Sequence, residues 1–521
     1  MRQTLRRIPT AHLLIVAILS LQYAVFQLAT GVQYWDAPRN LHWGIYTAEQ
    51  PRFLLDAEDQ YDRINGYPPD PATLNPNGSA VGRSTPLHPW WGPLYVLIFA
   101  AVWRLTGSYT ALALVVPLLA GAVVVLTYMM GRRLFNAQAG LIAAVLLAIF
   151  PIFREHAVMS FVEPISALLL LGAFWAFLEG RYAWVGAIGV LTVLGKVDLI
   201  PLYFGTLIGA IALSWRDPAR PTLRQIALVL VPPALTLLPW LIMIYVLLGR
   251  PTTVGGGPSM AMFRLLAPLV LDQFFLLPTT YTLVILALLV FLAGYALWCH
   301  DHAPALVYNV LGLWLGFGVA VLLFYMTMPG ASNNPRVCIP ALPALCLLVA
   351  DGLAYVSAKR RWWLFAPILM ILLFSSVGGM IFQWAQASLA KPLTPVWAVL
   401  REAPPGVILV EDYWNATLFT RHPVTWFAHD PVFERNILDD AANFQRYLAV
   451  TPIRYVVLPK DEAAFAVQQA TLPAVTLYQR LIFRRDLELR SGPVAAPAVH
   501  AYLAAHFPAQ PVGDYVIFTV R

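Results

Sequence analysis

Charged residues are scarce in this sequence: they make up 12% of the chain, whereas hydrophobic residues make up 59%. Soluble domains carry about 25% charged residues. The composition therefore excludes an ordinary soluble protein and predicts a polytopic α-helical membrane protein. Cysteine is scarcer still, with three residues, and Cys338 and Cys346 stand eight apart on one predicted helix. We therefore expect no disulfide framework.

Several familiar motifs are also missing. No Gly-x-x-x-x-Gly-Lys sequence occurs, which argues against ATP-driven transport. There is no Cys/His spacing typical of zinc sites and no nucleophile elbow. The net charge of +7 does not indicate nucleic-acid binding, because excess basic residues of membrane proteins normally lie in cytoplasmic loops.

The first hydrophobic run, from Ala11 to about Val32, follows Arg2, Arg6 and Arg7. It is long enough to span a bilayer, and no clean cleavage site follows it. We expect an uncleaved anchor with the N-terminus inside.

Further hydrophobic runs cover, roughly, 90–105, 109–130, 139–153, 164–178, 183–195, 199–215, 225–248, 278–298, 304–328, 339–356 and 363–385. Basic clusters fall at 132–133, 216–224 and 359–361. If every run spans the membrane, these three clusters lie outside. If the run 90–105 is instead interfacial or re-entrant, all three lie inside, and the positive-inside rule favours this second arrangement. That run is short and begins with prolines and tryptophans. We therefore expect about 11 spans, with the N-terminus in and the C-terminus out.

The composition changes near Lys391. Beyond it lie strand-like runs at 406–410, 424–427, 453–458 and 514–520, with helix-like stretches at 439–449 and 462–470. This alternation predicts a soluble α/β domain over 391–521 on the outer face, after a membrane domain over 1–390.

The polar segment 33–89, which the topology places on the outer face, carries four carboxylates within seven residues: Asp56, Glu58, Asp59 and Asp62. A carboxylate at this face can serve as general base on an acceptor hydroxyl. The simpler interpretation is a solvated acidic loop.

Other ionisable residues also fall at predicted outer loops, namely His88, Arg154, Glu163, Lys196, Asp198, Arg264 and Arg336. Ionisable groups near membrane depth are costly and are functional candidates by default. The sequence Lys196-Val197-Asp198 is the sharpest case, because it interrupts an apolar stretch over 182–215. The turn of a helical hairpin would give the same pattern.

Chemistry at an outer face has no access to cytosolic nucleotide sugars or ATP. A sugar carried on a membrane lipid phosphate fits instead. A carboxylate would accept the proton of the acceptor hydroxyl, and cations would hold the phosphate and stabilise the charge of the leaving group. A hydrophobic groove would take the prenyl tail. Such a single displacement inverts the sugar carbon and needs one base and no acid, because phosphate is already a good leaving group.

Short motifs follow one another along the membrane part: Asp56-Ala57-Glu58-Asp59-Gln60-Tyr61, the stretch from His88 to Tyr95, Gly131–Asn136 with Ala139–Ala144, Glu163-Pro164, and Pro335–Pro343. In this order they resemble the GT-C superfamily of polyprenyl-phosphate-sugar glycosyltransferases, specifically its protein mannosyltransferase/aminoarabinose transferase-like branch. No single motif is specific, but their order over some 300 residues is.

The resemblance implies that the catalytic carboxylate lies within Asp56–Asp59. The family often has Asp and Glu side by side before a tyrosine, whereas this chain has Asp-Ala-Glu-Asp. We favour Asp56 as the base, then Asp59, over Glu58. His88 stands where relatives keep a phosphate-contacting lysine or histidine.

The resemblance also makes Lys196 and Arg336 candidate phosphate-binding cations, with Arg264 and Arg154 behind them. Asp198 joins the substrate-binding set. Glu163 would be the second-loop acidic residue, which helps to bind a divalent metal in the oligosaccharyltransferase branch. Glu163 with Asp56 or Asp59 could hold such a cation, but we expect no cofactor here.

We therefore predict a glycosyltransferase of a prokaryotic cell membrane that transfers a hexosyl or pentosyl unit from polyprenyl phosphate to a lipid, glycan or protein acceptor. Membrane lipids surround it and nucleic acid plays no part. The alternative is a transporter or flippase of a lipid-linked saccharide, which should show internal repeats and polar residues at mid-span. A scaffold protein would leave Asp56–Asp59 dispensable.

Overall fold

The computed structural model describes most of the chain in a set of separate ranges. These are 9–31, 36–49, 93–196, 198–215, 221–247, 264, 279–299, 303–327, 335–358, 365–390, 393–410, 413–420, 422, 424–425, 440–450, 453–461, 471–473, 476–477 and 497–521.

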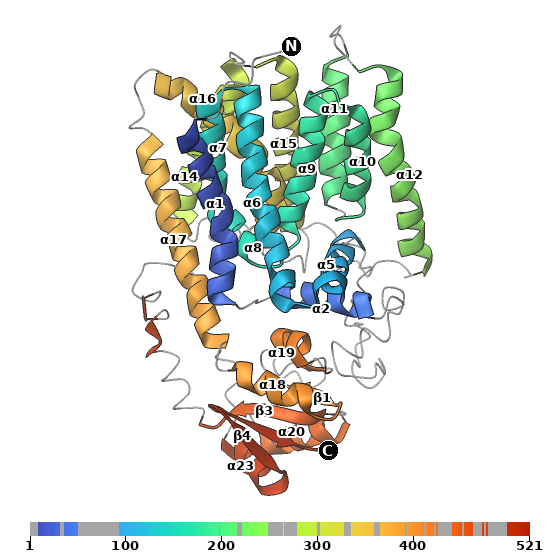
Figure 1. The fold of residues 1–521 in the computed structure, drawn as a ribbon, viewed down its shortest axis with the longest axis vertical. Coiled ribbons are helices and arrows are strands. Elements are labelled where there is room, and N and C mark those ends of the chain that lie inside the picture. Colours follow the sequence, from blue (N-terminus) through green and yellow to red (C-terminus); the bar gives the residue numbers. More distant parts are fainter. Residues whose placement is uncertain are drawn as a thin grey trace.

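A bundle of apolar helices forms the larger part of the molecule (Figure 1). In chain order its elements are α1 (Thr10–Thr30), α2 (Asp36–Glu49), α5 (Pro93–Thr106), α6 (Tyr109–Leu134), α7 (Ala137–Ile149), α8 (Pro151–Val158), α9 (Glu163–Leu178), α10 (Tyr182–Val193), the π-helix η2 (Pro201–Gly205) running into α11 (Thr206–Leu213), α12 (Leu223–Leu247), α14 (Thr279–Cys299), α15 (Ala305–Thr327), the 3₁₀-helix η3 (Pro335–Ala341) running into α16 (Leu342–Ala358), and α17 (Phe365–Ala390).

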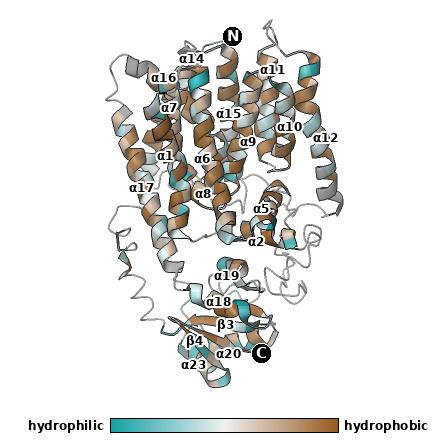
Figure 2. Ribbon diagram, in the orientation of Figure 1, coloured by the Kyte–Doolittle hydropathy of each residue, from teal (hydrophilic) through white to brown (hydrophobic). Residues whose placement is uncertain are grey.

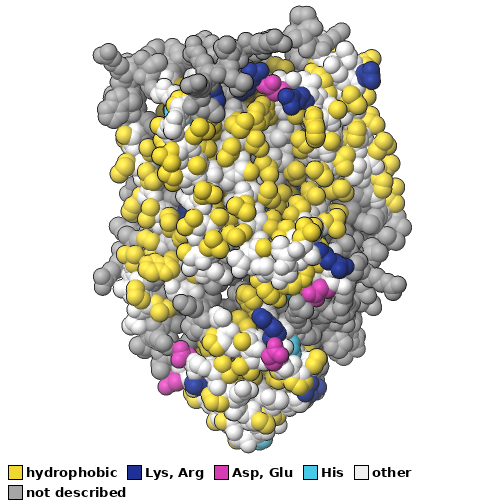
Figure 3. All heavy atoms as spheres, in the orientation of Figure 1, with side chains coloured by type: hydrophobic (Ala, Val, Ile, Leu, Met, Phe, Trp, Pro, Cys, Tyr) yellow, Lys and Arg dark blue, Asp and Glu magenta, His cyan; other side chains and the backbone are white. Residues whose placement is uncertain are grey.

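The outer surface of the bundle is hydrophobic (Figures 2 and 3). On α1 alone, Leu14, Ile18 and Val25 are 61%, 59% and 63% exposed. A water-soluble monomer rarely exposes apolar patches of this extent, so these side chains are suited to contact lipid. The interior is packed by larger side chains such as Trp314, whose ring meets Phe174 edge-on with centroids 4.8 Å apart.

Within the described residues, four helical segments have the length and hydropathy to cross a membrane: Thr10–Thr30, Tyr109–Leu134, Ala305–Thr327 and Arg336–Ala354. The bent pair α7–α8 would make a fifth. Other apolar helices, such as α9 and α10, are 10–17 residues long. The total of 11 spans therefore stays a prediction.

The run 139–153 was expected to be one span followed by a loop over 154–163. The start of this loop was wrong, because residues 151–158 form a second helix. The α7 helix ends at Ile149, and α8 leaves it at an angle of 65°. Pro151 has no N–H to donate and restricts Phe150 to an extended conformation (φ −64°, ψ 117°), which ends the first helix. Residues 151–158 then form a helix that carries Arg154, Glu155 and His156 into the interior.

The short helices α2 and α5 pack against each other at one end of the bundle (Figure 1). The last residues of α1 and the first residues of α6 lie at this same end. A 14-residue helix is about 21 Å long, and α5 lies at the end of the bundle instead of crossing it. This placement agrees with an interfacial or re-entrant 90–105 segment.

Beyond α17, a five-stranded sheet has the order β2-β1-β3-β5-β4. The strands are β1 (Val407–Leu409), β2 (Val424–Thr425), β3 (Ile453–Pro459), β4 (Ala509–Val512) and β5 (Tyr515–Thr519). The first three are parallel, and β5 is antiparallel to both β3 and β4.

Helices cover both faces of this sheet, so side chains that alternate along a strand are buried on opposite faces. α18 (Thr394–Glu402) and α19 (Tyr413–Thr420) cover one face, and α20 (Ala441–Val450) and α23 (Pro497–His506) cover the other. The predicted strands match β1, β2, β3 and β5, whereas the exposed β4, with Pro511, was not predicted. The predicted helix 462–470 lies outside the described residues. That 391–521 is a separate soluble domain stays a prediction.

The α19 helix joins the sheet region to the bundle. Leu418 is 2% exposed and packs in one apolar cluster with Leu41 and Ile45 of α2 and Trp103 of α5. Tyr109, at the start of α6, donates a hydrogen bond to the Leu418 carbonyl (3.4 Å). The sheet region is therefore held on the two short helices at this end of the bundle.

Shortening the Leu418 side chain should loosen this contact. For Leu418→Ala we expect a loss of about 2–5 kcal/mol of local stability, because a buried leucine is replaced by a cavity. Hydrogen exchange should then become faster in α2. The control is Leu503→Ala, which removes an equally buried side chain from the sheet face turned away from α19. Unchanged exchange in α2 of Leu418→Ala would contradict this role of α19.

Candidate functional site

Glu163 is the first residue of α9 and is only 1% exposed. Pro164 follows it in the first turn, where the missing N–H of proline costs no hydrogen bond. A carboxylate in the first turn also interacts favourably with the helix dipole. The sequence Glu163-Pro164 thus begins a helix and places a charge inside the bundle.

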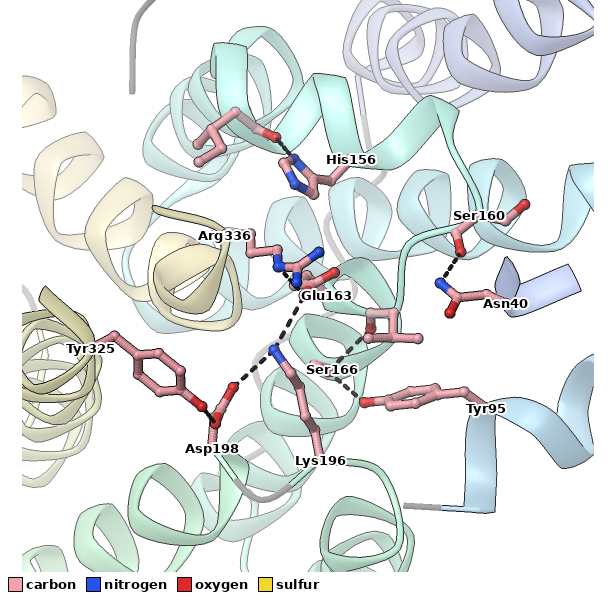
Figure 4. Close-up of polar contacts among 12 residues, drawn as sticks. Asn40, Tyr95, His156, Ser160, Glu163, Ser166, Lys196, Asp198, Tyr325 and Arg336 are labelled. Carbon is pink, nitrogen blue, oxygen red and sulfur yellow. Dashed lines mark hydrogen bonds and ion pairs between the residues drawn. The ribbon is translucent and has the colours of Figure 1, made fainter. Parts of the chain in front are cut away.

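Lys196 and Asp198 lie in the turn between α10 and η2 (Figure 4). The Lys196 ammonium contacts Oε1 of Glu163 at 3.2 Å and Oδ2 of Asp198 at 2.8 Å. Lys196 and Asp198 are each 5% exposed. The sequence is therefore a turn, as one of the two interpretations had it, and this turn carries a buried ion pair; its functional role stays a prediction.

Two residues that come later in the chain, on elements packed against α9 and η2, complete this cluster. Arg336, in the first turn of η3, places its Nε 3.6 Å from Oε1 of Glu163, and its side chain is 14% exposed. Tyr325, near the end of α15, donates a hydrogen bond to Oδ1 of Asp198. We refer to Glu163, Lys196, Asp198, Tyr325 and Arg336 as the charge cluster.

The formal charges of the charge cluster balance, with two carboxylates against one ammonium and one guanidinium. Ions buried in an apolar interior are stable only when they are paired, because the loss of hydration costs several kcal/mol per ion. Arg336 is the most exposed of the four ions, and Oε2 of Glu163 is buried without a hydrogen bond. Arg336 is therefore the ion of the cluster closest to solvent, and Oε2 of Glu163 could still accept a hydrogen bond.

The described segments on either side of residues 50–92 are bonded to the elements of the charge cluster. The Leu94 N–H donates to the Leu194 carbonyl (3.0 Å), two residues before Lys196. The Tyr95 hydroxyl lies 2.5 Å from Oγ of Ser166, one turn after Glu163. Gly195 permits this approach, since a Cβ there would come within 2.9 Å of the Tyr95 hydroxyl.

Two residues of α2, on the other side of the gap, also make hydrogen bonds to other elements. Asn40 donates to the Ser160 carbonyl (2.9 Å), just before α9. Glu49, the last described residue before the gap, accepts a hydrogen bond from the Trp103 indole (3.2 Å). The chain therefore re-enters the described structure at Pro93, beside the elements of the charge cluster, whereas it leaves at Glu49, next to the last turn of α5.

His156 was missed by the sequence analysis. Its Nδ1 lies 2.9 Å from the Ile152 carbonyl, so Nδ1 carries the proton, and Nε2 is buried without a hydrogen-bond partner. Its ring packs on Phe161 (centroids 4.7 Å apart), and the Arg336 guanidinium lies 5.7 Å from that same ring. The neighbouring Arg154 and Glu155 were the available signal, since three ionisable residues in a row interrupt an apolar run.

Two of the remaining predicted site residues, Arg154 and Arg264, are described. Arg154 is buried on α8 and donates to the Gln383 side chain (3.2 Å), with its guanidinium 4.9 Å from the centre of the Phe26 ring. Arg264 is exposed. Asp56, Glu58, Asp59 and His88 lie outside the described residues.

Within the described part of the chain, no group of three His, Cys, Asp or Glu side chains is arranged to hold a metal ion. The partners expected for Glu163 in such a site, Asp56 and Asp59, belong to the part that is not described. The absence of a cofactor therefore stays a prediction.

Comparison with protein-family models gives no match, and neither does comparison with curated proteins. Solved structures do match. ArnT from Cupriavidus metallidurans bound to undecaprenyl phosphate has a TM-score of 0.57 and 13% identity, and the match covers 98% of this chain and 97% of that chain. Apo ArnT gives the same TM-score at 14% identity, with 98% of each chain covered.

The archaeal oligosaccharyltransferase AglB from Archaeoglobus fulgidus, in complex with an inhibitory peptide and a dolichol-phosphate, has a TM-score of 0.51 at 13% identity. That match covers 90% of this chain and 72% of AglB. The fold is that of GT-C glycosyltransferases. At such low identity the likeness concerns the fold alone, and it confirms at that level the resemblance seen in the sequence.

The charge balance makes a prediction about stability. Lys196→Met should destabilise the protein by about 3–5 kcal/mol, because two buried carboxylates would then face Arg336 alone. Lys196→Met/Asp198→Asn removes one charge of each sign and leaves Glu163 with Arg336, so it should be more stable than the single variant. Thermal unfolding of the detergent-purified protein measures both. If the double variant were no more stable than Lys196→Met, charge balance would not be the constraint.

Proposed function

We propose that this chain transfers a sugar from a polyprenyl-phosphate donor to a hydroxyl acceptor, with inversion at the sugar carbon. The acceptor class is a lipid, glycan or protein, and the transferred unit is a hexosyl or pentosyl group. We place the reaction at the extracytoplasmic face of a cell membrane, so that the end of the bundle with α2, α5 and α19 faces outward.

The buried charge cluster is the observation that carries this proposal. Its elements are bonded to Leu94 and Tyr95, directly after the chain re-enters at Pro93 from the segment that contains Asp56–Asp59 and His88. The fold likeness adds support, because the matching ArnT structure holds undecaprenyl phosphate and the matching AglB structure holds a dolichol-phosphate and a peptide.

Lys196 and Arg336 would bind the phosphate of the donor. A sugar phosphodiester carries one negative charge, and the prenyl phosphate that leaves carries a second as the bond to the sugar breaks. Cations already in place stabilise the transition state more than the ground state, which is what accelerates the chemical step. Glu163 and Asp198 would hold these cations before the donor arrives.

A carboxylate of the segment Asp56–Asp59 would act as general base, with Asp56 favoured. It would take the proton of the acceptor hydroxyl while the hydroxyl oxygen bonds to the anomeric carbon. The electron pair of the breaking carbon–oxygen bond would pass to the phosphate. His88 would contact the phosphate from the same segment.

The test is release of polyprenyl phosphate from a panel of polyprenyl-phosphate sugars in the presence of crude acceptor. Loss of one general base typically costs 10²–10⁴-fold in rate. We expect Asp56→Asn to lose turnover by about this factor while donor binding is kept. The matched control is Glu402→Gln, a carboxylate exposed on α18.

Three outcomes separate the candidate functions. Loss of turnover in Asp59→Asn but not in Asp56→Asn would make Asp59 the general base and leave the mechanism unchanged. Full turnover in both variants would remove the base from this segment. No consumption of any donor by the wild type, with movement of lipid-linked saccharide between leaflets, would favour a flippase.

A further inference from the structure

A second polar site lies far from the charge cluster. It is a surface pocket of about 430 Å³ between the last turn of α6, the last turns of α9 and the first turns of α10. The opposite end of α6 begins at Tyr109, which packs on Phe419 of α19. Since α6 has 26 residues, the two ends lie about 39 Å apart, roughly the thickness of a bilayer.

Two arginines and one glutamate surround this pocket, so its formal charge is positive. Nε of Arg133 lies 2.9 Å from Oε1 of Glu179, and both side chains are partly exposed, at 37% and 29%. Arg181 is exposed, and its guanidinium makes no hydrogen bond or ion pair with a described residue. The pocket therefore presents one cation whose charge is not balanced within the described structure.

Two tryptophans border the same pocket. Trp184 is 63% exposed. The indole N–H of Trp175 is buried and donates no hydrogen bond to a described atom. A buried donor without an acceptor is unusual and costs free energy. The two indole rings line the pocket beside its cations.

The pocket lies at the border between charged and apolar surface. Figure 3 shows Lys, Arg, Asp and Glu side chains along the upper edge of the hydrophobic belt, and Figure 1 places the adjoining ends of α6, α9 and α10 at that level. Tryptophan and arginine at such a border are typical of the lipid headgroup region. The floor of the pocket is apolar, because Gly172 leaves room there: a Cβ would touch only Ile188, at 3.6 Å.

We propose that this pocket binds one anionic phospholipid of the surrounding bilayer, with the headgroup phosphate between Arg133 and Arg181. An acyl chain would descend along the apolar groove beside Gly172 and Ile188. In the proposed topology this end faces the cytoplasm, where basic residues near the membrane favour anionic lipids by about 1 kcal/mol each.

The experiment is native mass spectrometry of the full chain, purified in detergent and titrated with phosphatidylglycerol or with phosphatidylcholine. The wild type should bind one phosphatidylglycerol more tightly than phosphatidylcholine. Arg133→Gln/Arg181→Gln should weaken the first phosphatidylglycerol by about 30-fold. Arg224→Gln, an arginine exposed in the first turn of α12, is the matched control and should leave this affinity unchanged.

Two further variants separate a binding role from a structural one. Glu179→Gln removes the carboxylate that competes with the lipid phosphate for Arg133, so the variant should bind phosphatidylglycerol as tightly as the wild type or more tightly. If the Arg133–Glu179 pair only holds the pocket in shape, the variant should bind phosphatidylglycerol more weakly. Gly172→Leu fills the pocket floor without changing charge and should weaken binding.

The proposal is overturned by any of three results. The first is that the double arginine variant binds phosphatidylglycerol as the wild type does. The second is that Arg224→Gln weakens binding by the same factor. The third is that millimolar glycerol 3-phosphate displaces the lipid, since the pocket would then be a site for a soluble phosphate ester. None of these results bears on sugar transfer at the other end of the bundle.

Discussion

The ion pairing of Glu163 with Lys196 and Arg336 is the constraint on which the candidate site depends. In an apolar bundle, each of these charges is tolerable only because the others are present. Four separate segments must therefore meet: the start of α9, the turn after α10, the end of α15 and the start of η3. The cluster fixes how these segments meet, and in doing so it places two cations at one end of the bundle.

Contacts at this same end of the bundle join α5, the charge cluster and the C-terminal sheet region, and this is where we propose that the lipid-linked donor and the acceptor meet. The Leu94 and Tyr95 contacts attach α5 to the elements of the charge cluster. Leu418 attaches the C-terminal sheet region to α2 and α5 through α19. The described residues that flank the segment with the candidate base are thus bonded to other elements, Glu49 to Trp103 and Leu94 to Leu194. A structural role for the C-terminal part follows from this contact, although the sequence assigned it no chemistry.

Much of the helical part of the fold could be predicted from the sequence, because apolar runs, prolines and basic clusters are local signals. The hydrophobic runs correspond closely to the helices, and the predicted run 164–178 begins one residue after the start of α9. The bend at Pro151 was missed because the run 139–153 is uniformly apolar, and its charged continuation looked like a loop. His156 was missed for the same reason, since burial of a residue in an apparent loop depends on tertiary packing.

The sequence could place Glu163, Lys196, Asp198 and Arg336 only as candidates on one face of the membrane. It could not predict their ion pairs, because contacts between residues 33 to 173 positions apart leave no periodic pattern in a sequence. Tyr325 gave no signal at all, since a tyrosine near a helix end is common in membrane proteins. Arg154 shares the face but turns toward Gln383 of α17, a partner that only the packing of α8 against α17 reveals.

The central claim is that the charge cluster receives the phosphate of a polyprenyl-phosphate sugar. The most direct measurement is an experimental structure of the protein with a non-transferable polyprenyl-phosphonate sugar. The account predicts the phosphonate within about 4 Å of both the Lys196 ammonium and the Arg336 guanidinium, the distance of an ion pair. A phosphonate bound elsewhere, with the Lys196–Glu163 and Arg336–Glu163 pairs unchanged, would contradict it.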